Sequence, residues 1–575
     1  MKVSLALLGL VSVVADSYDD QAEAIVAKMS VNQWIAQMAQ VNIGFILNAD
    51  GSVNTNAITQ CAKLGVGSFL NGAFTPSQWR TLVSQIQSIY AANNAPPALY
   101  GLDSVHGANY VTGAILSPHQ INKGSTFNPS LVQNSAFITA RDTVAGGVNW
   151  VFAPGLDLTV HKRWSRVYET FGEDPYLASQ LGIAAVKGIQ SAPGVAASIK
   201  HFIGYGATSN GDDRGPAYLN DYQVLNYHAP SFIEAVKNAN PLSVMASYVS
   251  VNDVPMVVNT HLTVDLLRND LGFNGVLLTD WEDIYNLNYV HKLVNNNQDA
   301  IAMSMSKSSV DMSMIPYDLS FISLAQNLVN AGTIPSSRFR QSAKRIIKMK
   351  LQMGLYQNSV PGGDYVGLVG SAADRQAALD VARESIILLK NQNNVLPLSG
   401  QPKIFLTGPS IDNIGYLCGG WTWLWQGVTD NSKFPGSYSI KGAFQNLYSD
   451  QSKISSLQGV DISGVTTDSL NTAKYMASQA QYTIIAVGEQ PYAEMVGNTP
   501  DATLPAGQLQ YIRDIASTGT KVILVLVQGR PRLLNGVADV VHAVIDAMLP
   551  CMMGGQAIAE IILGIVNPSG RLSIT

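Results

Sequence analysis

Charged residues are scarce in this sequence, and their scarcity excludes one class of partner. Of 575 residues only 13% are Asp, Glu, Lys or Arg, against about 25% in an average globular domain. The 35 basic residues do not outnumber the 40 acidic ones, and the net charge is −5. Such a balance provides no positive surface to neutralise a phosphate backbone. We therefore expect no nucleic-acid partner.

Cysteine is equally scarce. The three cysteines, Cys61, Cys418 and Cys551, are odd in number and have no CxxC spacing, so neither a zinc ribbon nor a disulfide framework fits. A bridge between Cys418 and Cys551 stays open. The sequence also has no HExxH motif, no GxGxxG motif and no GxxxxGK[ST] phosphate loop. We expect neither a metal nor a cofactor, and the missing phosphate loop disfavours a nucleotide-dependent enzyme.

One long apolar run stands at the start of the chain. The segment MKVSLALLGLVSVVADS has a lysine at position 2, apolar residues over 3–14 and small residues around Ala15, which is typical of a secretory signal. The run is too short to span a bilayer, and no later segment reads as transmembrane. The sequence predicts a signal peptide over residues 1–15, a secreted protein and no membrane partner.

Length and hydrophobic content predict two domains. The chain exceeds the ~250–300 residues at which a single core stops growing, and 47% of it is hydrophobic. From residue 20 to residue 355, short apolar runs alternate with stretches of helix length, which indicates parallel strands with helical crossovers. Seven such runs, or eight with the first, favour a closed (β/α)8 barrel. The runs are NIGFIL (42–47), 65–70, 96–103, 149–158, 195–202, 242–248, 275–281 and 308–314.

A second domain is expected over residues 373–575. Residues 356–372 are rich in glycine and serine and read as a linker. Four buried-strand patterns follow with helical stretches between them, which predicts a doubly wound α/β sandwich. These patterns lie at 403–410, 482–490, 521–529 and 543–550, and ARESIILLKN (382–391) begins as a helix and turns apolar.

Polar side chains stand at the ends of several predicted barrel strands. Asp103, the pair Lys200 and His201, Tyr248 and Asp280 all occupy such ends. Each alone is explained by a helix cap or a solvated corner. Together they would meet at one mouth of a barrel, at a desolvation cost that packing does not require. Mixed acidic, basic and hydroxyl groups suit a ring of sugar hydroxyls better than a metal or a phosphate.

Tryptophans supply flat faces on which sugar rings stack. Trp281 follows Asp280 directly, and Trp421, Trp423 and Trp425 lie in CGGWTWLWQG. The alternative for this run is a hydrophobic core strand. The flanking glycines and Gln426 favour a loop.

At this point the sequence resembles glycoside hydrolase family 3, in particular its two-domain β-glucosidase and exo-β-glucanase branch. The resemblance runs in family order from about residue 29 to the end. It rests on these segments: GLDSVHG, SPHQINKGSTFNPSLV, RWSRVYETFGEDPYLAS, KHFIGYG, GVLLTDWEDI, ARESIILLKN, GGWTWLWQG, VGEQPYAEMVGN and NPSGRL. RWSR or NPSGRL alone would be weak, but the ordered set is highly specific.

The resemblance implies residue roles. Asp280 in LLTDW corresponds to the catalytic nucleophile, and Glu494 in QPYAEMVGN corresponds to the general acid/base. Family members use further side chains to hold the terminal sugar in subsite −1 and aromatic rings to clamp the next one. The matching subsite −1 residues are Asp103, Arg166, Lys200, His201 and Tyr248, and the matching clamp residues are Trp281, Trp425 and Trp421.

These roles imply a retaining mechanism, in which two carboxyl groups lie about 5 to 5.5 Å apart. We expect Lys200, Arg166 and the polar mouth to keep Asp280 charged, and Glu494 to sit in a drier, less positive place. Glu489, five residues before Glu494, competes for the acid/base role. It directly follows a predicted strand and is the more structural of the two.

The sequence therefore predicts a secreted retaining β-glucosidase or exo-β-glucanase acting on β-glucosides or β-glucan oligosaccharides. A β-xylosidase or another family activity uses the same machinery, and a catalytically silent carbohydrate-binding protein is a further alternative. Relatives usually continue beyond the point that corresponds to Thr575. Either the sequence is truncated or its second domain closes differently.

Overall fold

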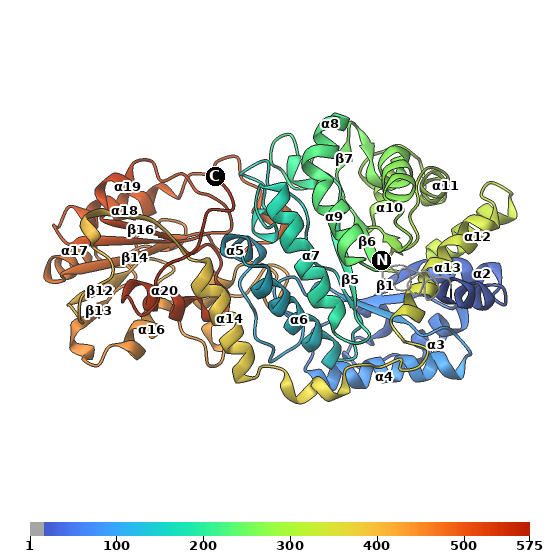
Figure 1. Ribbon diagram of the computed structural model, residues 1–575, viewed down its shortest axis with the longest axis horizontal. Coiled ribbons are helices and arrows are strands. Elements are labelled where there is room, and N and C mark those ends of the chain that lie inside the picture. The colour runs from blue at the N-terminus through green and yellow to red at the C-terminus, as the bar shows by residue number, and fades with distance from the viewer. Residues whose placement is uncertain (1–16) are drawn as a thin grey trace, which may run out of the picture.

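The computed structural model describes residues 17–575, so the predicted signal peptide over residues 1–15 lies outside the described residues. Two α/β domains lie side by side, with the blue-to-green half of the chain in one and the orange-to-red half in the other (Figure 1). No helix within 17–575 is both long and apolar enough to cross a membrane.

The first domain is a barrel of eight parallel strands. The strands are joined in the order β10-β1-β2-β3-β4-β5-β6-β9, and a parallel bridge between Leu278 and Met312 connects the two ends of this order. The (β/α)8 prediction is confirmed. The strands are β1 (Ala39–Asn42), β2 (Ser68–Leu70), β3 (Leu99–Leu102), β4 (Trp150–Val151), β5 (Ala196–Phe202), β6 (Ser243–Ala246), β9 (Val276–Leu278) and β10 (Ser313–Met314).

Helices surround the barrel, and most begin at a residue type that caps helices. Thr75 and Ser30 form capping boxes with Gln78 and Gln33, which satisfies backbone N–H groups that the first turn leaves free. The longer helices are α2 (Val31–Gln37), α3 (Thr55–Leu64), α4 (Pro76–Ala92), α5 (Gln120–Thr126), α6 (Pro129–Ala145), α7 (Pro175–Ser191), α9 (Pro230–Ala239), α10 (Asp283–Tyr289), α11 (Asn297–Lys307), α12 (Ser320–Asn330) and α13 (Ser336–Gln352).

One predicted barrel strand was misplaced. The run NIGFIL at 42–47 forms a 3₁₀ helix at Ile43–Ile46, and the first strand is β1, which ends at Asn42. Gln40 of β1 is fully buried and donates to Ser68 Oγ at 2.8 Å. This buried polar side chain breaks the apolar pattern that marks the other strands.

The second domain is a six-stranded sheet in the order β11-β16-β15-β14-β12-β13, with β11 antiparallel to β16 and the other pairs parallel. The four predicted strands are present, and two further strands stand at the edges. The strands are β11 (Ile387–Asn391), β12 (Ile404–Thr407), β13 (Ile454–Ser456), β14 (Tyr482–Gly488), β15 (Lys521–Val527) and β16 (Ala543–Asp546).

Helices cover both faces of this sheet (Figure 1). Successive residues of a strand point to opposite faces, so Ile484 packs in one core with α14, α16 and α20 while Ile485 packs in the other with α17 and α18. The doubly wound sandwich is confirmed. Its helices are α14 (Ala372–Ser385), α15 (Ile414–Cys418), α16 (Ile440–Leu447), α17 (Leu470–Gln479), α18 (Ala506–Ala516), α19 (Val537–Val540) and α20 (Gly554–Ile562).

The segment predicted as a linker contains a 3₁₀ helix at Gly363–Leu368. Arg80 of α4 holds its start by donating to the carbonyl oxygens of Val360 and Pro361 at 3.1 and 2.8 Å. Cys418 and Cys551 are both buried and free, so the disulfide left open by the sequence is not formed.

Buried hydrogen bonds join the two domains. Asn122 of α5 donates to the carbonyl oxygen of Ala547 and accepts from the backbone N–H of Leu549, each at 2.9 Å. The hydroxyl of Tyr168 donates to the carbonyl oxygen of Tyr492 at 2.7 Å. Buried polar groups of this kind lose stability when a partner moves away, so they fix how the second domain lies against the barrel.

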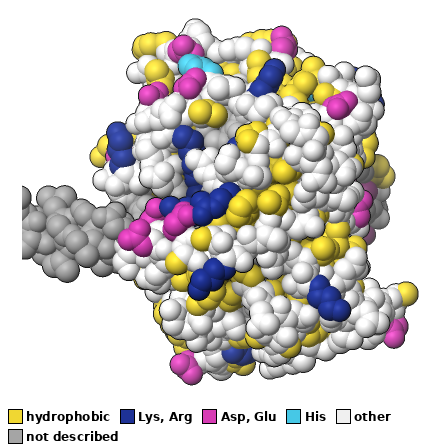
Figure 2. Space-filling model, turned by 90° about the vertical axis from the view of Figure 1, so that its right-hand side faces the viewer, with side chains coloured by type: hydrophobic (Ala, Val, Ile, Leu, Met, Phe, Trp, Pro, Cys, Tyr) yellow, Lys and Arg dark blue, Asp and Glu magenta, His cyan; other side chains and the backbone are white. Residues whose placement is uncertain are grey.

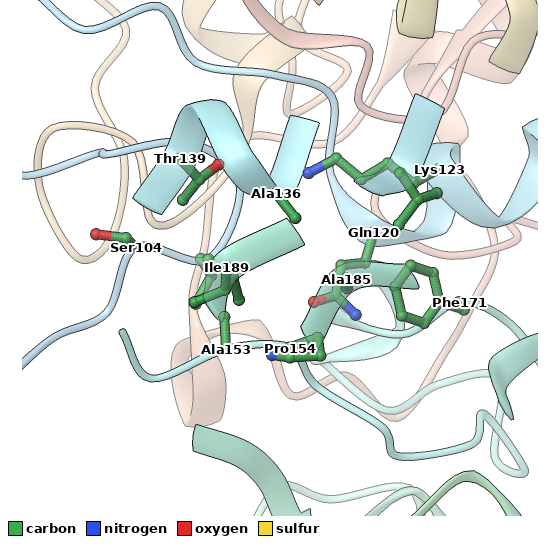
Figure 3. A pocket seen from close by; sticks show the side chains of 12 residues that line it. Ser104, Gln120, Lys123, Ala136, Thr139, Ala153, Pro154, Phe171, Ala185 and Ile189 are labelled. Carbon is green, nitrogen blue, oxygen red and sulfur yellow. The ribbon is translucent and has the colours of Figure 1, made fainter. Parts of the chain in front are cut away.

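A small cavity of about 20 Å³ lies between α5, α6 and α7. Lys123 extends toward Ala136 along this cavity (Figure 3). Lys123 is 5% exposed, and no ion pair among residues 17–575 involves it. Burial lowers the pKa of its amine to about 8.

Figure 2 shows one end of the barrel domain. Charged side chains are few on this face, and blue and magenta atoms lie next to one another (Figure 2). On this face the low charge content of the sequence appears as a surface without a broad patch of positive or negative charge (Figure 2).

Candidate active site

Strand ends of the barrel converge on one cavity. Asp103 follows β3, Lys200 and His201 lie near the end of β5, Tyr248 follows β6, and Asp280 follows β9. The cavity has a volume of about 690 Å³, within the range of roughly 300–1,000 Å³ usual for small-ligand pockets. All ten side chains proposed from the sequence line it, namely Asp103, Arg166, Lys200, His201, Tyr248, Asp280, Trp281, Trp421, Trp425 and Glu494.

Asp280 lies at the bottom of a mostly buried site. Its Oδ1 accepts the backbone N–H of Trp281 at 2.7 Å, and its Oδ2 lies 3.8 Å from His201 Nε2. Burial first, and then the negative charge of Glu494, raise the pKa of Asp280 to about 6, although Arg166 and Arg214 lower it. Asp280 and Glu494 line the same cavity, although they belong to different domains.

Arg166 lies between His201 and Glu494. Its Nε and Nη2 donate to the Glu169 carboxylate at 2.9 and 2.8 Å, and Nη2 also donates to His201 Nε2 at 3.1 Å. Its Nη1 lies 3.7 Å from Glu494 and has no hydrogen-bond partner among the residues described. This buried donor is available to a ligand hydroxyl.

His201 is held as a neutral ring. Its Nδ1 donates to Asp157 Oδ2 at 2.8 Å, so Nε2 is left to accept from Arg166. Burial and the nearby cations Arg166 and Lys200 place the pKa of His201 well below its usual value. The ring therefore carries no charge, and both of its nitrogens have partners in the protein.

Lys200 is paired with Asp103, and the cations that act on Asp280 are Arg166 and Arg214. Its Nζ donates to Asp103 Oδ1 at 2.7 Å and lies 5.7 Å from the centre of the Trp421 ring. The expectation that Lys200 keeps Asp280 charged is wrong, because its charge is already paired with Asp103. The pair presents one acceptor and one donor to the same side of the cavity.

Glu494 enters the cavity from the second domain, at the start of a 3₁₀ helix (Glu494–Gly497) after β14. Arg214 Nη2 donates to its Oε2 at 2.7 Å, and Arg214 also stacks on the Tyr248 ring at 3.9 Å. The expectation of a less positive place for Glu494 is wrong, because two guanidinium groups face it. Sequence reasoning missed Arg214, whose only signal is its loop after the strand that carries Lys200 and His201.

The tryptophan run forms a loop and not a core strand. Trp421 and Trp423 have positive φ values of 54° and 58°, and the rings of Trp421 and Trp425 meet edge to face at 6.4 Å. Gln426 fixes the Glu494 loop by accepting from Ala493 N at 2.9 Å and donating to Ala493 O at 3.1 Å. Across the cavity, Trp281 packs against Tyr317 at 5.6 Å.

Glu489 is not part of the cavity lining. Its carboxylate pairs with Arg530 and Arg532 at 3.2 Å each and accepts the backbone N–H of Gly529 at 3.3 Å. Arg530 in turn donates to the carbonyl oxygen of Gly497 at 2.6 Å. Glu489 therefore supports the Glu494 loop from behind.

No group of three or more His, Cys, Asp or Glu side chains within residues 17–575 is arranged to hold a metal ion.

The chain matches the N-terminal domain of glycosyl hydrolase family 3 over residues 30–349 and its C-terminal domain over residues 386–575. It belongs to glycoside hydrolase family 3. The protein is therefore a glycoside hydrolase, and its two α/β domains are those of the family.

Relatives named as glycosidases agree with this membership. The lysosomal beta glucosidase of Dictyostelium discoideum is 38% identical over 97% of this chain and 72% of its own length. The beta-xylosidase of Formosa agariphila is 29% identical over 84% of this chain and 69% of its own. The crystal structure of an exo-1,3/1,4-beta-glucanase from a Pseudoalteromonas species superposes with a TM-score of 0.86 at 28% identity, covering 97% of this chain and 71% of that one.

Proposed function

We propose that this protein is a retaining β-glucosidase or exo-β-glucanase that removes terminal non-reducing β-D-glucosyl residues. The observation that carries the proposal is the contact path between the carboxyl groups of the two domains. It runs from Asp280 through His201 and Arg166 to Glu494. Similarity to the Dictyostelium beta glucosidase and to the Pseudoalteromonas exo-glucanase supports glucose as the sugar.

In the first step the Asp280 carboxylate attacks the anomeric carbon while Glu494 protonates the departing oxygen. The carbon–oxygen bond to the leaving group breaks, and a covalent glycosyl-enzyme on Asp280 forms. In the second step Glu494 takes a proton from water, and the water oxygen displaces Asp280 from the anomeric carbon. Both steps invert the carbon, so its configuration is retained overall.

The remaining side chains bind the sugar. Asp103 and Lys200 form a buried pair at 2.7 Å, which can accept from one hydroxyl and donate to another. The unpartnered Nη1 of Arg166 supplies a further donor. Trp281 and Trp425 offer apolar ring faces beyond the first sugar, because both line the cavity and Trp425 is 43% exposed.

Trapping with a 2-deoxy-2-fluoro-β-glucoside tests the nucleophile and the sugar together. We expect one fluoroglucosyl group per protein on the peptide that carries Asp280, and β-glucose as the first product seen by NMR during hydrolysis of an aryl β-glucoside. A label on another carboxylate, or α-glucose as the first product, contradicts the proposal.

A β-xylosidase is the second candidate, because a family member of that name is 29% identical over 84% of the chain. Measuring kcat/KM on an aryl β-glucoside and on the matching aryl β-xyloside separates the two candidates. We expect kcat/KM to be highest on the glucoside. A higher value on the xyloside assigns the second activity instead.

We further propose secretion, on the basis of the N-terminal sequence. Expression of the full chain in a eukaryotic secretory host should yield protein in the medium that begins near Asp16. Retention inside the cell with an intact N-terminus contradicts secretion and leaves the catalytic proposal untouched.

A further inference from the structure

A second, shallow groove lies on the barrel domain where α10, α11 and α12 meet. It has a volume of about 560 Å³, and its lining includes Tyr289 at the end of α10 and Asn296, Asn297 and Gln298 at the start of α11. Helix α10 begins three residues after Asp280 and rises ~10 Å over its seven residues. The groove therefore starts one short helix away from the nucleophile.

The groove is built from uncharged hydrogen-bonding groups around one aromatic ring. Asn297 Nδ2 donates to the Tyr289 hydroxyl at 2.6 Å, and Asn288 Nδ2 donates to Asn297 Oδ1 at 3.1 Å. These bonds hold the amides and the ring in place, while half of the Tyr289 side chain stays exposed. A fixed ring with flanking amides needs no reordering when a ligand binds.

The charge of the groove restricts its ligand. Asp299 is the one charged residue in its lining, and its Oδ2 already accepts from Asn296 Nδ2 at 2.8 Å. Without Lys or Arg in the lining, an anionic ligand has no partner. A neutral chain rich in hydroxyl groups fits amides and a tyrosine face.

Short segments of chain lead from the catalytic cavity to the groove. Tyr317, which lines that cavity, is 65% exposed and packs edge to face on Trp281 at 5.6 Å. Three residues further, Ser320 Oγ hydrogen-bonds the Tyr285 hydroxyl at 2.8 Å, and the Tyr285 ring meets the Tyr289 ring at 6.2 Å. Tyr285 is buried, so Tyr317 at the cavity and Tyr289 in the groove are the exposed rings of this region.

From this arrangement we propose that the groove binds glucosyl residues of an oligosaccharide beyond those held in the catalytic cavity. The occupant is the reducing-end part of a β-glucan oligosaccharide whose terminal sugar lies at Asp280. This inference rests on the proposed function. It makes the protein an enzyme that favours chains longer than a disaccharide.

Steady-state kinetics of Tyr289→Ala test the groove on three substrates: an aryl β-glucoside, a β-linked glucose disaccharide and the corresponding pentasaccharide. The variant should raise KM for the pentasaccharide about 3- to 10-fold, the effect of losing one ring face, with kcat unchanged. KM for the aryl glucoside and the disaccharide should stay within twofold. Tyr475→Ala removes an exposed tyrosine from α17 of the second domain and should change none of these values.

Two further variants keep the test decisive if Tyr289→Ala folds poorly. Tyr289→Phe keeps the ring and should leave KM for the pentasaccharide within twofold, whereas Gln298→Ala removes a groove amide and should raise it about 2- to 5-fold. An unchanged KM for the pentasaccharide in both Tyr289→Ala and Gln298→Ala overturns the groove proposal. An equal rise in KM on all three substrates does so too. Failure of the proposed function is distinguishable, because the unmodified protein would then leave the aryl glucoside intact.

Discussion

Arg214 is the cation that contacts the Glu494 carboxylate most closely. Its guanidinium lies 2.7 Å from Glu494 and stacks on Tyr248. The sequence identifies the two carboxyl residues, but it cannot show which cation faces which carboxylate. Lys200 forms an ion pair with Asp103. Arg214 lies in a loop that carries no recognisable motif. The residue types in the pocket could thus be predicted, whereas their pairing could not.

Replacing Arg214 by methionine should weaken acid catalysis by Glu494. Arg214 Nη2 donates to Glu494 Oε2 at 2.7 Å, so the guanidinium fixes the direction of this carboxyl group. We expect kcat to fall about 10-fold on an aryl β-glucoside with a poor leaving group, because a misplaced acid loses catalysis steeply. Arg513→Met, on α18 of the second domain, is the matched control and should leave kcat unaltered. An unchanged kcat in Arg214→Met refutes this role.

The pKa of Asp280 sets the acidic limb of the pH profile of activity. A nucleophile must be ionised, and burial with the Glu494 charge raises the pKa of Asp280 to about 6. Activity should therefore fall below about pH 6, approaching tenfold per pH unit. The pH dependence of kcat/KM for the free enzyme measures this directly. Full activity retained down to pH 4 contradicts the raised pKa.

Lys123 is a buried cation whose charging costs stability. Its folded pKa of about 8 lies below the reference value of 10.5, so between these values the unfolded chain binds a proton that the folded chain lacks. The free energy of unfolding therefore rises from pH 8 to pH 10.5 as this group loses its proton. Below pH 8 the folded protein carries the full cost of burying the charged amine. Lys123→Leu should stabilise the protein by about 3 kcal/mol at pH 7.

Urea unfolding at pH 7 and at pH 10 checks the Lys123 prediction. The gain of Lys123→Leu over the unmodified protein should shrink at pH 10, where the lysine is largely neutral in the folded state. Lys187→Leu, at an exposed position of α7, should show no such gain. A Lys123→Leu variant less stable than the unmodified protein at pH 7 is the contrary outcome.

At the scale of elements, apolar runs locate strands that are buried on both faces, and they fail where a strand departs from that pattern. β5 and β15 are buried over nearly their whole length and were identified from the sequence. β1 carries the buried Gln40, which interrupts its apolar pattern. The apolar run that follows it therefore resembles a strand more closely than β1 does. β11 and β13 lie at sheet edges with exposed or half-buried residues, which is why their patterns are weak.

The loop from Trp421 to Gln426 is a positioning element for the acid/base. Gln426 makes two hydrogen bonds with Ala493, the residue before Glu494. Gln426→Ala should lower kcat about 10- to 100-fold on a substrate with a poor leaving group, because a misplaced acid loses catalysis steeply. The rate of glucosylation by 2,4-dinitrophenyl β-glucoside, which needs no acid, should change far less.

Gln376→Ala on the exposed face of α14 is the control for Gln426→Ala. It should leave both rates unaltered. Equal losses on the two substrates in Gln426→Ala would show that the loop supports the whole site and not the acid/base.

At the scale of the whole molecule, the site exists only where the two domains meet. Asp280 follows a barrel strand and Glu494 follows a sandwich strand, and buried bonds such as those of Asn122 to Ala547 and Leu549 hold the domains together. The barrel and the sandwich could each be predicted from periodicity. Their relative placement could not, because it depends on side-chain contacts between residues far apart in the sequence.

Azide rescue is the most direct measurement of the acid/base assignment across this interface. Glu494→Ala should hydrolyse an activated aryl β-glucoside slowly, and added azide should restore turnover and yield β-glucosyl azide, because azide needs no general base. Glu489→Ala, whose carboxylate only supports the loop, should show no rescue. Rescue of Glu489→Ala without rescue of Glu494→Ala would contradict the pairing of Asp280 with Glu494.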